Sequence, residues 1–182
     1  TAYNWETNYS NAGSDYNFQN DQFSSNSATP GDAISKNVTP TFARGQAMLA
    51  TIPIVDYVAG DACNCNVGTP PNSLVHFKQN RARKGSTLSL TPNSTDGFVY
   101  QDEFVNWLKS TYPGRFSHPT APLMLSLDNE PDIWNTTHAE IVTSPQTYDG
   151  YTNRAIEFAS AVKEVAPDAM IFGPTTATYT CL

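Results

Sequence analysis

The sequence predicts an α/β fold, either a (β/α)8 barrel or a part of one. Short apolar segments alternate with segments of helical periodicity, in the order strand, helix, strand, helix, strand, helix, strand. This alternation is typical of parallel strands joined by right-handed crossovers. In addition, no glycine-rich phosphate loop is present, which argues against a nucleotide-binding sheet and favours a barrel.

The first expected elements lie within residues 1–59. Thr1–Glu6 is aromatic and alternates briefly, as at the end of a strand, and residues 7–30 form a long polar connection. The aromatic residues in this connection favour an ordered loop, and long ordered loops are usually functional. Residues 30–45 predict a helix that Pro40 interrupts and Gly45 ends. The apolar run over residues 46–59 is typical of a strand buried on both faces.

The second half of the chain is more regular. Residues 60–83 read as irregular structure, and residues 102–114 predict a helix with Phe104, Val105, Leu108 and Tyr112 on one face. The segment PLMLSLDNE, residues 122–130, predicts a strand. Residues 147–169 form the clearest helical pattern, and residues 169–178 predict another short buried strand.

Composition and charge narrow the class of protein. Charged residues make up 15% and aromatic residues 12% of the chain, which fits a secreted globular protein. The net charge of -7 argues against a nucleic-acid partner. No apolar run approaches the roughly 18 residues that cross a bilayer, so no membrane partner is expected. No signal peptide is visible and the chain starts without Met, so we expect that an upstream segment has been removed. Four N-glycosylation sequons, close to the number that chance produces, begin at Asn8, Asn37, Asn93 and Asn135.

Neither the cysteines nor the acidic residues predict a metal site strongly. One of Cys63, Cys65 and Cys181 stays unpaired unless it finds a partner elsewhere. A Cys-x-Cys pair is a weak metal signal, because zinc sites usually have wider spacing and a second ligand pair. A loop disulfide, with Cys181 as one possible partner, or free thiols are the alternatives. The acids of residues 96–103 suit a helix start on dipole grounds, and calcium is the one cofactor they could hold.

Polar residues gather where the expected strands end. These places are Asn4 to Glu6, Asp56 with Tyr57, and Asp128 to Glu130, whereas the strand interiors are Met, Leu, Ile and Val. In (β/α)8 barrels the active site lies at the carboxyl ends of the strands. The sequence therefore predicts an active site built from these three clusters.

Glu130 is the leading catalytic candidate. Partial burial beside Trp134 can raise the pKa of such a carboxyl group, as a general acid requires near neutral pH. Asn129 could donate a hydrogen bond to a substrate hydroxyl, and Trp5, Tyr57 and Trp134 offer flat apolar faces for sugar rings. The alternative is that Glu130 caps the following turn and Trp134 is part of the core.

The remaining candidates are weaker. Glu6 could be a second active-site carboxylate, but a supporting role that holds a neighbouring Arg or amide is favoured. His76, His118 and His138 are scattered and more typical of ordinary hydrogen-bonded histidines. Ser126 lies within a strand, with no nucleophile-elbow motif around it.

Several blocks of the sequence occur in an order that resembles a known family. They are YNWETN with NAGSD, the IPIV strand, LSLTPNSTDG with DEFVNWL, SLDNEP followed by a Trp, and the AIEFA to IFGP helix and strand. Together they resemble the glycoside hydrolases of family 44, over nearly the whole chain. The resemblance implies a secreted, retaining endo-β-1,4-glucanase that cleaves cellulose-type polymers or xyloglucan. It also implies a (β/α)8 barrel with an added β-sandwich domain.

The resemblance also assigns site residues. The acid/base of the family falls on Glu130, with Asn129 beside it in contact with the sugar. Retaining hydrolysis needs a second carboxylate about 5–5.5 Å from the first. In the family this nucleophile lies on a later strand, beyond the end of this chain. Glu140, Glu157 and Glu164 do not replace it, since they lie on the expected helix or in a loop.

Residues 1–182 are therefore expected to be a partial catalytic domain with about the first five strands of the barrel. A C-terminal segment or a second polypeptide should complete the barrel, because an open parallel edge invites aggregation. The expected partner is a β-glucan polysaccharide. The alternative is a non-catalytic carbohydrate-binding or structural extracellular protein, which would lack a carboxylate opposite Glu130. An unrelated α/β enzyme is a third possibility if the order of the blocks is coincidence.

Overall fold

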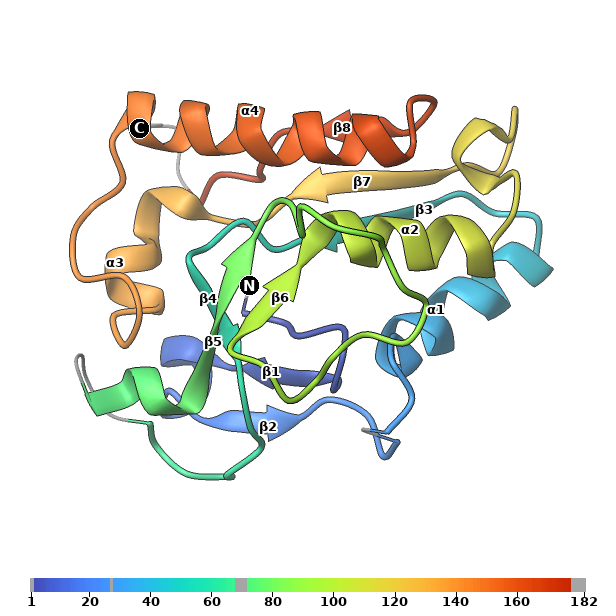
Figure 1. Cartoon of the computed structure of the whole chain (residues 1–182). Coiled ribbons are helices and arrows are strands. Elements are labelled where there is room, and N and C mark those ends of the chain that lie inside the picture. The colour runs from blue at the N-terminus through green and yellow to red at the C-terminus, as the bar shows by residue number, and fades with distance from the viewer. Residues whose placement is uncertain (1, 27, 68–71, 178–182) are drawn as a thin grey trace.

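The structure of this chain is a computed structural model that describes residues 2–26, 28–67 and 72–177 (Figure 1). In chain order its strands are β1 (Tyr9–Asn11), β2 (Asn20–Gln22), β3 (Met48–Ile52), β4 (Tyr57–Ala59), β5 (Phe77–Arg81), β6 (Phe98–Tyr100), β7 (Leu123–Leu127) and β8 (Met170–Phe172). Its helices are α1 (Asp32–Ala43), α2 (Gln101–Thr111), α3 (Trp134–Thr137) and α4 (Tyr148–Val165). The described residues also include the short 3-10 helices η1 (Gly13–Tyr16), η2 (Asn72–His76), η3 (Arg115–Ser117) and η4 (Pro131–Ile133). None of the helices described here has the length and apolar character that crossing a membrane requires.

The main sheet is parallel and has the strand order β3-β7-β8. Met48 pairs with Leu123, and Met124 pairs with Met170. The connection from β3 to β7 contains a second sheet, β4-β5-β6, followed by α2, whereas α4 alone connects β7 to β8. The predicted alternation is therefore confirmed for β7, α4 and β8. In Figure 1, α4 runs alongside β7.

The two helices of these crossovers form where the sequence predicts them. In α2, the residues Phe104, Val105 and Leu108 are fully buried, as their spacing on one face requires. Thr147 caps the N-terminus of helix α4, and its side-chain oxygen accepts a hydrogen bond from the Gly150 backbone N–H. Its buried face includes Phe158.

The main sheet has three parallel strands within the described residues, not the five strands that were expected, and it forms no closed barrel. Its last strand, β8, is not buried as predicted, since Met170 is 43% and Phe172 47% exposed. The reason is its position, because no described strand pairs with its outer edge. An open apolar cavity of about 790 Å³ lies between β8 and α4.

The apolar run of residues 46–59 is two strands in two sheets rather than one strand. β3 ends at Ile52, Pro53 brings no backbone N–H, and the chain then leaves the main sheet. β4 instead pairs with β5 in a second sheet of order β4-β5-β6. The sequence did not predict β5, because its inward residues Lys78 and Asn80 are polar although both are buried.

The N-terminal segment also differs from the prediction. Residues 5–8 form a turn, and Asn4 makes an isolated bridge to Tyr9 rather than belonging to a strand. The expected loop after it contains the antiparallel hairpin of β1 and β2. These strands are three residues long and rich in Asn, so their hydrophobic pattern is absent.

Helix α1 continues through Pro40, which was expected to interrupt it. Pro40 lies in the last turn, where the missing N–H costs one hydrogen bond to the preceding turn. The helix ends as predicted near Gly45, which has a left-handed φ of 71°.

Candidate active site

The carboxyl ends of β3 and β7 are joined by the side chain of Asp128. Its Oδ2 accepts hydrogen bonds from the backbone N–H groups of Ile54 at 2.7 Å and Val55 at 3.1 Å. Asp128 is 1% exposed and has a left-handed φ of 63°. Pro53 has no backbone N–H, so the regular strand pairing of β3 stops there. The Asp128 carboxylate instead accepts hydrogen bonds from the N–H groups of the two residues that follow Pro53. Asp128 therefore holds the strand ends together.

Glu130 is positioned between β7 and β8. Its backbone N–H donates to the Thr175 carbonyl oxygen at 2.6 Å, and Asn129 forms a bridge to the same residue. Glu130 has a φ of 51°, and Pro131 then starts η4. Two residues with positive φ within three positions turn the chain away from the sheet, and the half-buried Glu130 side chain faces a cavity.

This cavity has a volume of about 250 Å³. One wall comes from the segment between β7 and α4, and the other from the N-terminal hairpin and the residues after it. The described lining residues are Ser10, Asn11, Ala12, Ser14, Asp15, Phe23, Asn129, Glu130, Trp134, Thr137 and His138. Asp15 is the second carboxylate in this set, and Glu140, Glu157 and Glu164 are not in it.

The hairpin wall is held against α3 by close packing at Gly13. A Cβ atom at this position would lie 2.2 Å from the Thr137 carbonyl oxygen, and Gly13 has a φ of 56°. The Gly13 N–H donates to the Asn11 side chain at 2.7 Å. Sequence reasoning did not assign this wall to the site, although the aromatic residues of the long N-terminal connection indicated an ordered and functional segment.

His138 is a second site residue that the sequence did not single out. It lines the cavity, and its Nδ1 lies 3.1 Å from Oε1 of Glu140, whose side chain is fully buried. A carboxylate at a ring nitrogen sets the orientation of an imidazole. Glu140 therefore fixes the orientation of the His138 ring in the cavity that Glu130 also lines. The two residues are only two positions apart in the sequence, but their side chains meet because of the turn after α3.

Trp134 supports Asn129. The indole Nε1–H donates to the Asn129 carbonyl oxygen at 2.8 Å, and the ring packs edge-on against Tyr151. Trp134 is only 2% exposed. Little of its face is open, so its burial argues against the predicted stacking of a sugar ring and favours the alternative that it belongs to the core. Asn129 remains half-buried in the cavity wall.

Trp5 does not lie in this cavity. It is fully buried and stacks on Phe104, with ring centroids 5.4 Å apart, and it also packs against Trp107. With no accessible face, it does not support the predicted role as a surface for sugar stacking. Its aromatic character belongs to the core.

Glu6 is a buried ion-pair partner. Its Oε2 lies 3.3 Å from Nζ of Lys78, which also donates to the Ser94 carbonyl oxygen at 2.7 Å. Burial raises the pKa of Glu6 to about 7, and the Lys78 charge opposes this effect. Glu6 is not a lining residue of the Glu130 cavity, so the pairing favours the supporting role, with Lys in place of the expected Arg or amide.

Asp56 and Tyr57 lie apart from Glu130, contrary to the expectation that the three polar clusters meet. Tyr57 belongs to β4, and both residues line a different cavity of about 520 Å³. Asp56 forms an ion pair of 2.5 Å with Arg154 of α4. The departure of the chain from the main sheet after Ile52 explains this separation.

The acids of residues 96–103 do not form a metal cluster in the described structure. Asp96 accepts from the Phe98 N–H, and Asp102 accepts from the Lys84 and Glu103 N–H groups. Glu103 accepts from the Ser89 N–H and pairs with Lys84. These acids bind N–H and ammonium groups at the start of α2 and in the loop before it. The arrangement therefore favours a role in stabilising the start of the helix over calcium binding.

Comparison with known proteins identifies close relatives of this chain. The sequence profile of glycoside hydrolase family 44 matches residues 9–182. The beta-mannanase/endoglucanase A of Caldicellulosiruptor saccharolyticus is 33% identical over 184 aligned residues, which cover 95% of this chain and 14% of that protein. Endoglucanase A of Paenibacillus lautus is 31% identical, over 96% of this chain and 26% of that protein.

Solved structures agree with these matches. The family 44 endoglucanase Cel44A of Clostridium thermocellum superimposes with a TM-score of 0.88 and 35% identity. A family 44 xyloglucanase of Paenibacillus polymyxa, solved with xyloglucan, superimposes with a TM-score of 0.89 and 31% identity. In both cases the match covers 97% of this chain and 36% of the solved one. The chain thus spans about a third of the length of these enzymes.

Proposed function

This chain belongs to glycoside hydrolase family 44, and from this premise we propose that it is part of a retaining endo-β-1,4-glucanase acting on cellulose-type or xyloglucan chains. The observation that supports this most directly is the position of Glu130. It stands after the carboxyl end of β7, is bonded through its backbone N–H to Thr175 in the segment after β8, and lines a cavity together with Asn129. Carboxyl strand ends are where enzymes with parallel barrels place their catalytic groups.

In the proposed reaction Glu130 is the acid/base. It protonates the glycosidic oxygen as the bond to the leaving sugar breaks, and it then takes a proton from the water that hydrolyses the glycosyl-enzyme intermediate. Asn129 donates a hydrogen bond from its side chain to a sugar hydroxyl. The nucleophile is carried by a segment outside this chain, about 5–5.5 Å from Glu130 in the assembled enzyme.

The described structure supports the non-catalytic alternative less well than the catalytic one. A non-catalytic binding protein would use Trp5, Tyr57 and Trp134 together as a surface for stacking sugar rings. Trp5 and Trp134 are buried, and Tyr57 lines a different cavity.

We also propose that the protein is secreted. The disulfide between Cys63 and Cys65 supports this, since disulfides persist in oxidising compartments.

The decisive test uses Glu130→Gln in the whole protein and two substrates. The variant should lose hydrolysis of β-glucan, by about 100-fold or more. It should keep much of the first step on an aryl β-glucoside whose phenolate leaves without protonation. Glu157→Gln, an exposed change on α4, is the control and should retain the wild-type rate on both substrates. If Glu130→Gln hydrolyses β-glucan at the wild-type rate, the acid/base assignment is wrong.

A further inference from the structure

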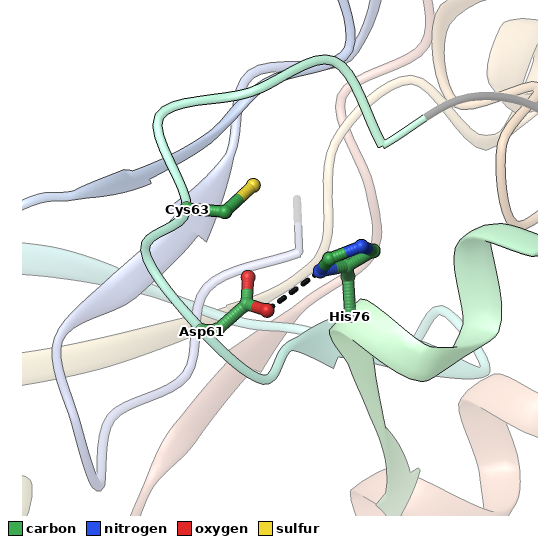
Figure 2. Close-up of side chains that lie close together, drawn as sticks. All are labelled: Asp61, Cys63 and His76. Carbon is green, nitrogen blue, oxygen red and sulfur yellow. Dashed lines mark hydrogen bonds and ion pairs between the residues drawn. The ribbon is translucent and has the colours of Figure 1, made fainter.

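The connection between β4 and β5 brings together three side chains of types that bind metals. Asp61 and Cys63 follow β4, and His76 ends η2 (Figure 2). One donor atom from each of the three lies within 4.8 Å of the others. His76 Nδ1 is 2.6 Å from Oδ2 of Asp61. Within residues 2–26, 28–67 and 72–177, no second group of His, Cys, Asp and Glu side chains meets in this way.

The positions of Asp61 and His76 are set by neighbouring structure. The Gly60 N–H donates to the His76 carbonyl oxygen at 2.8 Å. The side-chain amide of Asn20, in β2, donates to the same carbonyl at 2.9 Å and to Oδ1 of Asp61 at 3.2 Å. This leaves Oδ2 of Asp61 directed at the imidazole. Hydrogen bonds of this kind orient metal ligands in known sites.

The sulfur of Cys63 is the variable part of the cluster. In the structure it is bonded to Cys65 in a disulfide. A disulfide sulfur is not a thiolate, and the thiolate is the form that binds metals. Reduction would supply two thiolates from one loop, and the Cys63 sulfur already lies within 4.8 Å of donor atoms of Asp61 and His76. In zinc sites each thiolate sulfur lies about 2.3 Å from the ion.

We propose that Asp61, Cys63, Cys65 and His76 form a zinc site when the Cys63–Cys65 disulfide is reduced. A dithiol reductant gives two electrons and two protons to the disulfide and becomes a disulfide itself. Zinc binding then releases the two thiol protons. The neutral imidazole binds through Nδ1 with its proton on Nε2, so that the ion replaces the hydrogen bond between His76 and Asp61. Two thiolates, an imidazole and a carboxylate complete four-coordinate zinc. The disulfide and the zinc ion are thus alternative cross-links within the β4–β5 connection.

Cys-x-Cys alone did not predict this site, because the second ligand pair was not evident in the sequence. His76 supplies one of these ligands across the β4–β5 connection, and Asp61 supplies the other. The site also lies near the candidate active site. Asn20, which binds Asp61, accepts a hydrogen bond at 2.8 Å from the side chain of Asn11, and Asn11 lines the Glu130 cavity.

The test measures metal binding by the whole protein in its two redox states. Wild-type protein is reduced with a phosphine without oxygen, freed of reductant, and titrated with Zn²⁺ or with Co²⁺ as a coloured substitute. We expect one zinc per chain to remain after gel filtration, and a thiolate-to-cobalt charge-transfer band with Co²⁺. The oxidised protein should show neither.

Variants identify the ligands. Cys63→Ser and His76→Gln should each lose the stoichiometric zinc, and Asp61→Asn, the mildest change, should weaken its retention. Cys181→Ser is the matched control for a third thiol and should bind as the wild type does. The proposal is overturned if the reduced protein retains no zinc, or if oxidised protein retains it equally. It is also overturned if zinc and the cobalt band survive in both His76→Gln and Asp61→Asn.

Discussion

Oδ2 of Asp128 lies 2.7 Å from the backbone nitrogen of Ile54, and this hydrogen bond joins the ends of two adjacent parallel strands. The same oxygen serves Val55. Asp128→Ala should lower the free energy of unfolding by about 3 kcal/mol or more, because buried N–H groups lose their acceptor at about 1–3 kcal/mol each. Asp128→Asn retains one acceptor oxygen and should cost less. Urea denaturation of the whole protein measures both, with the exposed Asp168→Asn as control. Equal stability of Asp128→Ala and the wild type would contradict the assignment.

Trp134→Phe tests how the candidate site at the end of β7 is supported. The ring is kept, but the indole N–H to the Asn129 carbonyl is lost. We expect a loss of about 1 kcal/mol in stability. The rate on β-glucan should fall as well, since Asn129 precedes Glu130. Thermal denaturation and kcat are the two readouts. A variant with reduced stability but an unchanged kcat would show that Asn129 and Glu130 are held by other contacts.

His138→Ala tests whether the cavity wall binds substrate. Its imidazole lines the cavity and is oriented by Glu140. Loss of one hydrogen bond to a sugar costs about 1.4 kcal/mol, so the KM for β-glucan should rise about tenfold while kcat changes less. His118→Ala, outside the cavity, is the matched control. An unchanged KM would remove His138 from the binding site.

The raised pKa of Glu6 predicts that the stability of the fold depends on pH. This pKa is about 7 in the folded protein, raised by burial from 4.5. A raised carboxyl pKa means that the folded state holds the proton more tightly than the unfolded state. Its contribution is therefore fully present below about pH 4.5 and is lost as the pH rises to about 7, on the order of 3 kcal/mol in total. Urea denaturation across this range should give a flatter profile for Glu6→Gln than for the wild type. Glu157→Gln should keep the wild-type profile, and identical profiles for Glu6→Gln and the wild type would refute the prediction.

The sequence predicted the parts of the fold that follow simple periodicity. Helix α4 and strand β7 formed as expected, and Asn129 and Glu130 after β7 line the candidate site. Strand β5 was missed because Lys78 and Asn80 point inward and are satisfied there by hydrogen bonds, which a hydrophobic pattern does not reveal.

The sequence did not predict which aromatic residues lie in the core and which line the cavity. A large flat ring suits both a core and a sugar-binding surface, so composition does not separate the two. Trp5 packs on Phe104, whereas Phe23 is 69% exposed and lines the Glu130 cavity. The distinction depends on where the N-terminal hairpin folds, and that contact joins segments more than a hundred residues apart.

The tight approach of Gly13 to Thr137 bears on how this protein could be re-engineered. Ser14 and Asp15, beside it, are exposed and line the cavity, so a mutant library could vary both to seek altered polymer preference. Gly13 must stay constant in that library. Any larger residue there would push the hairpin away from α3 and open the cavity that the selection is meant to reshape.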